Sequence, residues 1–288
     1  MSYQSRTNFK KVVLPNGMEI FCLQKEEIFI IYDQIQEYFR NGIELKAGNT
    51  VFDVGANIGM FSLWVDRLCT GNVSIYAFEP MPEVFQVLEE NSKSCQSENI
   101  KVLPYGLSRS SKTQIFSYYP NLTSISTAYF NESKEEKDKF KKAAMQKITN
   151  IRNSSNLSSP LSWYTKIPRF LLSFILDIKV EKAFRSQQVT CQLKTLSEAI
   201  SDWGVQQIDL LKIDVEKSEL DVLLGIAEAD WAKIKQIVLE VHDLDYRVEK
   251  ITSLLSSKGF SEVTVEQENY LNDTEIFNIY ALRSKSNL

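Results

Sequence analysis

Short apolar runs alternate with helically spaced apolar positions through the first half of the chain. Runs typical of buried strands occur at 50–54, 73–78 and 100–103, and helical spacing indicates helices at 59–69 and 82–91 between them. Strand–helix–strand alternation with short turns is typical of a parallel sheet with helices on both faces. The pattern therefore predicts an α/β fold.

The same alternation returns in the second half of the chain and changes at its end. Strands are expected at 188–193, 208–213, 236–241, 262–266 and 276–282, and helices at 196–203, 218–224 and 246–258. The last two strands follow each other without a helix, and a loop with Asn269, Asn272 and Asp273 joins them. Such a connection predicts an antiparallel pair at the edge of the sheet.

An N-terminal extension precedes this alternation. Two β-rich runs, 11–14 and 18–23, flank the pair Asn16-Gly17, and Asn-Gly between such runs is a strong hairpin signal. Apolar residues then recur at helical spacing over 27–39. We therefore expect a β-hairpin followed by one helix ahead of the main domain.

Residues 131–186 interrupt the rhythm and form a predicted helical insertion. The segment 132–147 is dense in Lys and Glu, 150–160 is rich in Asn and Ser and indicates a mobile loop, and 163–184 is apolar and basic, typical of one or two helices. The charged run fits a solvated helix face. The apolar stretch leaves three alternatives open: packing on the core, a lid over a ligand cleft, or a peripheral membrane contact.

Charge and composition narrow the functional classes. The chain has 33 Lys and Arg against 37 Asp and Glu, a net charge of −4, which argues against nucleic-acid binding. Hydrophobic residues make up 43%, enough for a core, and we expect an extension, 1–48, followed by one domain, 49–288, that holds the insertion. The longest apolar stretch, 170–178, is too short for a membrane span of about 20 residues, and the polar start is unlike a signal peptide. A cytoplasmic protein without a membrane span is expected.

Histidine and cysteine usage excludes familiar zinc chemistry. His242 is the only histidine, so a site or mechanism that needs several imidazoles is excluded. The four cysteines lie far apart and form no CxxC pair, which excludes a Cys-rich zinc site. Each lies in an apolar pattern, so we expect buried free thiols.

A motif at the end of the first predicted strand of the alternation carries the main chemical signal. Asp53, Gly55, Asn57 and Gly59 alternate with apolar residues, among them Ala56, and a predicted helix follows. Glycines permit a tight turn and close approach of a ligand to the backbone, and the helix N-terminus presents free N–H groups. A dinucleotide fold uses GxGxxG to seat a pyrophosphate, whereas a carboxylate at Asp53 is a better neighbour for a cationic sulfonium. The motif therefore favours S-adenosylmethionine over NAD.

A second carboxylate, Glu79, ends the next predicted strand and precedes Pro80. A carboxylate at this point can accept both ribose hydroxyls of an adenosine. The alternative is a charge beside a helix N-terminus, which the helix dipole favours. The turn after the third strand, with Gly106 and Leu107, is where we expect the adenine ring.

Four segments, VFDVGANIG, AFEP, IDLLKIDVEKSELDVLLG and IVLEVHD, occur in this order. In this combination the chain resembles the FkbM family of S-adenosylmethionine-dependent methyltransferases over residues 49–131 and 189–282, and in its N-terminal hairpin. The resemblance implies a Rossmann-like class I methyltransferase sheet of seven strands with the last antiparallel, and hydroxyl acceptors on small molecules, often of secondary metabolism. One departure is Lys217, where the family commonly carries Gly, and nothing carries over to the insertion.

Candidate bases for an acceptor hydroxyl follow the later strands, because ligands bind at the carboxyl ends of the strands in such sheets. Asp214 and Glu216 follow the strand 208–213, and His242 follows the strand 236–241. His242 is the leading candidate, since imidazole titrates near neutral pH, and the alternative is a histidine that caps the strand. Glu216 is expected either to orient the imidazole or the acceptor, or to be a first-turn helix carboxylate.

Mg²⁺ is an alternative participant, because it binds proteins through a few carboxylates and keeps several waters. Oxygen and nitrogen ligands are available after the same two strands: Asp214, Glu216, Glu240, His242 and Asp243. Some methyltransferases bind diol acceptors through such an ion. The sequence leaves the metal requirement open.

These observations together predict an S-adenosylmethionine-dependent O-methyltransferase that acts on a small molecule, free or presented by a carrier protein. Three alternatives stay open: N-methylation of an amide or amine, a NAD-binding oxidoreductase, and a non-catalytic module that docks a carrier domain through the insertion. The acceptor, the methylated atom and the oligomeric state are not fixed by the sequence.

Overall fold

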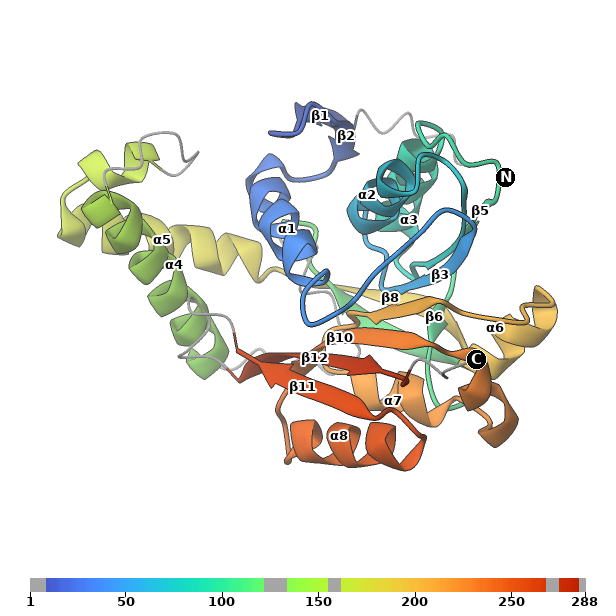
Figure 1. The fold of residues 1–288 in the computed structure, drawn as a ribbon. Helices are drawn as coiled ribbons and strands as arrows, with labels where there is room; N and C mark the ends of the chain where they lie inside the picture. Colours follow the sequence, from blue (N-terminus) through green and yellow to red (C-terminus); the bar gives the residue numbers. More distant parts are fainter. Residues whose placement is uncertain (1–8, 122–133, 155–161, 268–274, 285–288) are drawn as a thin grey trace.

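A computed structural model describes residues 9–121, 134–154, 162–267 and 275–284 of the protein (Figure 1). The expected loop with Asn269, Asn272 and Asp273 lies outside these residues. Within the described ranges, no helix is long and apolar enough to cross a membrane.

The centre of the molecule is a seven-stranded sheet. Its strands are β3 (Asn49–Val54), β4 (Val73–Phe78), β5 (Ile100–Leu103), β9 (Leu210–Ile213), β10 (Gln236–His242), β11 (Glu262–Glu266) and β12 (Ile276–Leu282). They lie in the order β11-β12-β10-β9-β3-β4-β5, and β12 runs antiparallel to both of its neighbours while the other pairs are parallel. The predicted α/β fold and its antiparallel edge pair are confirmed.

Helices cover both faces of this sheet, because adjacent residues of each strand point to opposite sides. Val51 packs in one core beneath α1, α2 and α3, and its neighbour Phe52 packs in the other beneath α6, α7 and α8 (Figure 1). The helices are α1 (Lys25–Glu37), α2 (Met60–Leu68), α3 (Pro82–Ser92), α6 (Leu196–Asp202), α7 (Glu219–Leu224) and α8 (Arg247–Ser257), with the 3₁₀ helix η3 (Glu228–Lys233). The four cysteines are free thiols, and three of them are buried: Cys22, Cys69 and Cys191.

A second sheet contains a strand that the sequence pattern had grouped with the main alternation. β6 (Gly106–Leu107), β7 (Lys112–Tyr118) and β8 (Gln187–Lys194) form a three-stranded sheet, with β7 and β8 antiparallel. The strand expected at 188–193 therefore exists but lies outside the seven-stranded sheet, and β6 and β7 were not predicted. Burial alternates along much of β7 and β8, unlike the continuously buried β9, because one face of this sheet lies toward solvent.

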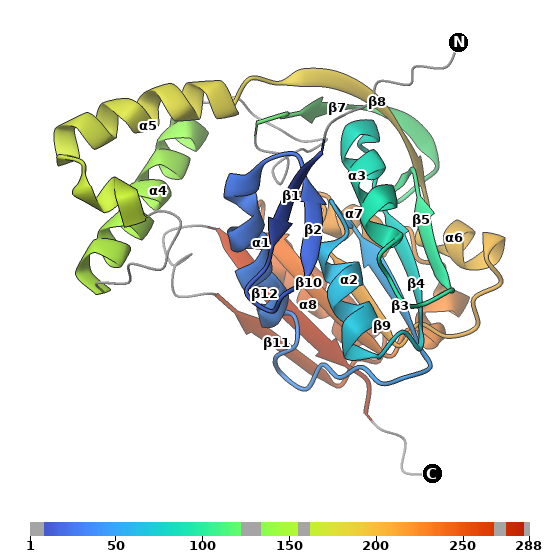
Figure 2. The ribbon, with the colours of Figure 1, turned by 90° about the horizontal axis from the view of Figure 1, so that it is seen from above.

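The N-terminal hairpin and helix are confirmed. β1 (Lys10–Val13) pairs antiparallel with β2 (Glu19–Cys22), and α1 follows. The side chain of Asn91 on α3 fixes the hairpin, since it accepts a hydrogen bond from Phe21 N at 2.8 Å and donates to Phe21 O at 2.9 Å. The extension is therefore packed on the main domain, with α1 beside α2 (Figure 2).

The insertion is helical and stands away from the sheet (Figures 1 and 2). It consists of α4 (Lys134–Ser154), the 3₁₀ helix η2 (Ser162–Lys166) and α5 (Arg169–Ala183). These three elements, which we call the helical arm, have a small core of their own, formed by Ile148, Tyr164, Leu172 and Leu176.

The expected loop at 150–160 is wrong in its first part, because α4 continues through Ser154. Residues 155–161 lie outside the described ranges. Apolar residues at helical spacing continue beyond Asn150, and α4 continues with them. Arg152 donates a hydrogen bond to Ile167 O at 3.0 Å. That bond fixes the end of α4 against the turn before α5.

Candidate functional site

The loop between β3 and α2 is held against the ends of two neighbouring strands. Gly55 N and Ala56 N donate to Phe78 O at 3.1 and 2.9 Å, at the end of β4. Gly55 has a φ of +76°, and a Cβ placed on it would come within 1.8 Å of Asp214 O, after β9. Gly59, with a φ of +87°, is the N-cap of α2. Only glycine fits at Gly55, so the loop conformation follows directly from the motif.

Glu79 lies directly after β4 and is buried. Its Oε2 accepts from Asn57 N at 3.0 Å, and its Oε1 accepts from Met81 N at 2.8 Å. Burial raises the pKa of Glu79 to about 7, and the two backbone hydrogen bonds offset that increase only in part. Each carboxylate oxygen keeps a second lone pair, so the group can still accept hydroxyls when it is ionised.

Asp53 is fully buried and has partners within the fold. Ser62 Oγ donates to Asp53 Oδ2 at 2.7 Å, and Lys212 Nζ lies 3.1 Å from Asp53 Oδ1. The same ammonium donates to Gly55 O at 2.8 Å. In this structure the charge of Asp53 is compensated by Lys212, and the pair fixes the carbonyl at the start of the glycine loop.

The predicted adenine residues lie beside the end of β4. A Cβ on Gly106 would come within 3.3 Å of Pro80 Cγ, so these two residues are in close contact. Leu107 follows in β6 and is buried in the core on the α6 side. The structure thus places Pro80 and Gly106 together, while an adenine contact by them or by Leu107 stays a prediction.

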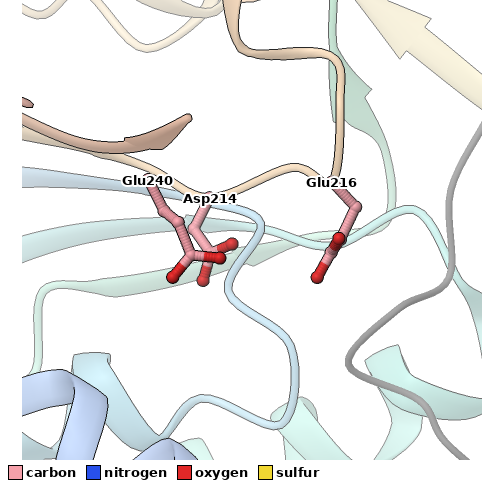
Figure 3. A group of neighbouring side chains, drawn as sticks. All are labelled: Asp214, Glu216 and Glu240. Carbon is pink, nitrogen blue, oxygen red and sulfur yellow. The ribbon is translucent and has the colours of Figure 1, made fainter. Parts of the chain in front are cut away.

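Three carboxylates meet at the ends of β9 and β10. The ligand atoms of Asp214, Glu216 and Glu240 lie within 4.8 Å of one another (Figure 3). Helix α1 supplies two hydrogen bonds to this group: Tyr38 OH donates to Asp214 Oδ2 at 3.0 Å, and Gln34 Nε2 donates to Glu240 Oε2 at 3.4 Å. The N-terminal extension therefore contributes directly to the candidate acceptor side of the site.

The carboxylates affect one another electrostatically. Burial, and after it the charges of Asp214 and Glu240, raise the pKa of Glu216 well above its ordinary value. Burial lowers the pKa of Lys212, but Asp53 and Asp214 outweigh it, so the net change is upward and Lys212 stays a cation. Its Nζ lies 3.7 Å from Asp214 Oδ2. One buried ammonium therefore contacts both the loop 55–59 between β3 and α2, the glycine loop, and the cluster of three carboxylates.

His242 lies between two carboxylates. Its Nε2 is 3.4 Å from Glu216 Oε2, and its Nδ1 is 3.7 Å from Glu219 Oε1. Glu219 is fully buried at the start of α7 and accepts a hydrogen bond from Lys217 N at 2.6 Å. The predicted neighbours His242, Glu216 and Asp214 are thus brought together. Asp243 instead accepts from Val248 N at 2.9 Å, at the first turn of α8.

Sequence reasoning missed four residues of this site. Lys212 stands in the apolar run DLLKI, where a lysine inside a buried strand is itself an indication of a charge partner. Glu219 lies in the first turn of a short helix, and Gln34 and Tyr38 lie on the N-terminal helix or at its C-cap. Nothing in the local sequence relates these three to a site, because their partners are distant along the chain.

The strand order and the reversed β12 define the class of protein, a class I S-adenosylmethionine-dependent methyltransferase. Residues 53–262 match the methyltransferase FkbM domain, and the chain belongs to this family. It is therefore an enzyme that uses S-adenosylmethionine as methyl donor.

Similar proteins span a wide range of lengths. The chain is 31% identical over 274 residues to the 31-O-demethyl-FK506 methyltransferase FkbM of Streptomyces tacrolimicus, covering 94% of this chain and 96% of that protein. It is 28% identical over 277 residues to methyltransferase sdnD of Sordaria araneosa, covering 93% and 95%. It is also 33% identical over 282 residues to the AMB antimetabolite synthetase AmbE of Pseudomonas aeruginosa, covering 95% of this chain but only 12% of the synthetase. The same domain thus occurs in proteins of about this length and inside a far longer one.

Proposed function

We propose that the enzyme methylates a hydroxyl group of a small molecule, with His242 as the general base. The observation that carries this proposal is the position of His242, whose Nε2 and Nδ1 lie beside Glu216 and Glu219 at the carboxyl edge that also holds the glycine loop. Support for oxygen as the methylated atom comes from the relative FkbM, whose name describes methylation at an oxygen. That the acceptor of this chain is a hydroxylated small molecule is likewise proposed here.

The residues present fit S-adenosylmethionine. Glu79 is a buried carboxylate with free lone pairs at the end of β4, as the ribose hydroxyls require, and the Gly55 loop brings backbone close to the same place. When bound, this cofactor supplies a methyl group already activated on a sulfonium. We assign the cofactor site to Asp53, Gly55, Ala56, Asn57, Gly59, Glu79, Pro80, Gly106 and Leu107.

The chain's own residues have to align the acceptor and remove its proton. In the transfer, the acceptor oxygen forms a bond to the methyl carbon as the carbon–sulfur bond breaks, and the hydroxyl proton passes to His242. Glu219, fully buried, then faces the imidazolium at Nδ1. Glu216, whose pKa is raised by burial and by its neighbours, is suited to a hydrogen bond with the acceptor before the transfer, or with the imidazolium at His242 Nε2 once that nitrogen has taken the proton.

The acceptor reaches this site either free or on a carrier protein. The synthetase AmbE supports the second source, because a segment similar to this chain is one part of that much longer protein. N-methylation of an amide or amine is the chemical alternative, since a histidine base could serve a nitrogen acceptor as well. S-adenosylmethionine tritiated in its methyl group separates the two, tested with paired compounds that differ only in the hydroxyl. Label transfer only to the compound with the hydroxyl supports O-methylation, and transfer to both supports N-methylation.

One observation favours Mg²⁺ as a further component of the site: the three carboxylates of Asp214, Glu216 and Glu240 lie together. These oxygen ligands suit a hard cation and would then orient a diol acceptor. Dialysis against a chelator tests it: loss of methyl transfer that Mg²⁺ restores would support the ion, and unchanged transfer would exclude it.

The cofactor assignment is tested by calorimetric titration with S-adenosylhomocysteine. We expect the native protein to bind and Glu79→Ala to bind at least tenfold more weakly. Glu83→Ala is the control. It removes a carboxylate from the first turn of α3, where Glu83 accepts a hydrogen bond from Tyr118 OH, and is expected to bind as the native protein does. Equal affinity of Glu79→Ala and the native protein would refute the ribose role.

A further inference from the structure

The helical arm carries a charge opposite to that of the rest of the chain. Residues 134–183 hold eleven Lys and Arg against five Asp and Glu, a net charge of +6. Because the whole chain carries −4, the remainder carries −10. Between 139 and 176 there are seven basic residues and no acidic one. This segregation concentrates positive potential on the arm.

Helix α5 has two apolar stripes, each with a residue at every fourth position. One stripe is buried: Leu172, Leu176 and Val180. The other lies on the opposite side of the helix and is 74%, 64% and 56% exposed at Phe170, Phe174 and Ile178, respectively. Packing in the small core of the arm itself therefore explains the buried Leu172 and Leu176, but not the exposed stripe. Large apolar side chains gathered on one exposed face indicate a contact with something outside the chain.

The exposed stripe begins at the free end of the arm. The other end of α5 joins the body of the protein, where the ring of Phe184 lies 6.2 Å from that of Tyr119 and β8 follows. Phe170 is in the first turn of α5, close in sequence to the exposed side chains of Lys166 and Arg169. Figure 2 shows this end of α5 standing clear of both sheets.

The two acidic residues of α5, Asp177 and Glu181, follow Phe174 along the helix, and each has a cation of its own. Glu181 is 2.9 Å from Lys137, and Asp177 pairs with Lys141, both on α4. These ion pairs join α4 to α5 and compensate the two acids. Ahead of Asp177, the charged residues of α5 and of the turn before it are basic: Lys166 and Arg169.

We propose that the free end of the arm binds the surface of an anionic lipid membrane through the arm patch, defined as Lys166, Arg169, Phe170, Leu171, Phe174 and Ile178. Phenylalanine and aliphatic side chains of a surface helix enter the interface between headgroups and acyl chains, and lysine and arginine beside them pair with anionic headgroups. The contact is peripheral, on one side of the membrane.

The shape of the patch favours lipid over a protein partner. Helix α5 projects from the body of the protein (Figures 1 and 2), and an exposed stripe along a single helix is a convex surface. A specific protein interface needs shape complementarity over a standard area, about 800 Å² per partner, whereas a fluid lipid surface adapts to a convex helix. The charge also suits a surface that is uniformly anionic, because between 139 and 176 every charged residue is basic.

Cosedimentation of the full chain with vesicles tests the proposal without any methyl acceptor. We expect binding to mixed phosphatidylcholine–phosphatidylglycerol vesicles, much weaker binding to pure phosphatidylcholine vesicles, and release by salt. Each basic residue near the surface is worth about fivefold in partition coefficient, so Lys166→Gln with Arg169→Gln should weaken binding about 25-fold. Phe170→Ser with Phe174→Ser should weaken it at least tenfold.

A matched control uses exposed apolar residues elsewhere on the protein. Val13→Ser with Ile115→Ser removes side chains of similar exposure on β1 and β7 and should leave vesicle binding unchanged. Calorimetry with S-adenosylhomocysteine confirms that each variant is folded. Absence of binding by the native chain to the anionic vesicles, or equal loss in the control variant, would overturn the proposal. So would a stable complex formed through the patch with an acidic protein while the anionic vesicles are not bound.

Discussion

The ammonium of Lys212 lies 3.1 Å from the carboxylate of Asp53, with both side chains almost fully buried. The two residues are direct partners across the parallel strands β3 and β9. Lys212 also donates to Gly55 O and approaches Asp214 to 3.7 Å. A single cation thus links the loop assigned to the cofactor with the carboxylates assigned to the acceptor side.

Replacing Lys212 with Met should destabilise the fold by about 3–5 kcal/mol, because Asp53 would be left as an unpaired buried charge. The free energy of unfolding from urea denaturation measures this. The double variant Lys212→Met with Asp53→Asn should recover part of the loss, since the uncompensated charge is then removed as well. A loss below about 1 kcal/mol in the single variant, or full additivity in the double variant, would show that the pair is not coupled.

Cofactor affinity should increase with pH around neutrality. The pKa of Glu79 is about 7 in the folded protein, and only the ionised carboxylate accepts both ribose hydroxyls. Below that pKa the affinity for S-adenosylhomocysteine should fall by up to about tenfold per pH unit. Calorimetry between about pH 6 and pH 8 measures it. Glu79→Gln should bind weakly at every pH in this range, and an equally steep pH dependence in that variant would assign the titration to another group.

The same raised pKa has a consequence for stability. A carboxyl group whose pKa is higher in the folded than in the unfolded state disfavours folding once it ionises. The contribution of Glu79 is therefore most favourable below its ordinary pKa of 4.5 and is lost as the pH increases to about 7. This loss arises at the buried carboxyl group that we assign to the cofactor site.

His242→Ala should lower methyl transfer by about 10²–10⁴-fold, the usual contribution of a general base. The affinity for S-adenosylhomocysteine should stay within about twofold, because His242 ends β10, and β9 and β3 lie between that strand and β4, which Glu79 follows. Label transfer to an acceptor found by profiling measures the first quantity, and calorimetry the second. Transfer at the native rate would remove His242 from the mechanism, while loss of both quantities would indicate a structural role.

The elements that the sequence predicted correctly are those whose signal is local. β4 and β5 were predicted to the residue, because each is a short run dominated by apolar and β-branched residues. β8 has an equally clear local signal, yet its place in a separate sheet depends on pairing with β7, about seventy residues earlier along the chain. Local pattern identifies a strand and leaves its partners open.

The site divides in the same way. The positions of the glycine loop and of Glu79 at neighbouring strand ends could be predicted, because each follows a strand directly in the sequence. The contact of Lys212 with Asp53 could not, because it depends on the register of β9 against β3. Tyr38 was equally hidden, since its hydrogen bond to Asp214 requires the N-terminal helix to pack over the carboxyl edge of the sheet.

At Lys217 the chain departs from the resemblance, and the backbone conformation there shows why glycine suits this position. Its φ is +75°, in the left-handed region that disfavours residues with a Cβ. Its N–H and C=O bond to Glu219 and Arg247 through backbone atoms that any residue has. Lys217→Gly should therefore raise the free energy of unfolding by about 1 kcal/mol, measured by urea denaturation, while Lys217→Ala, which keeps the Cβ, should give no gain. Equal stabilisation by both variants would mean that the lysine side chain, and not the backbone conformation, is unfavourable.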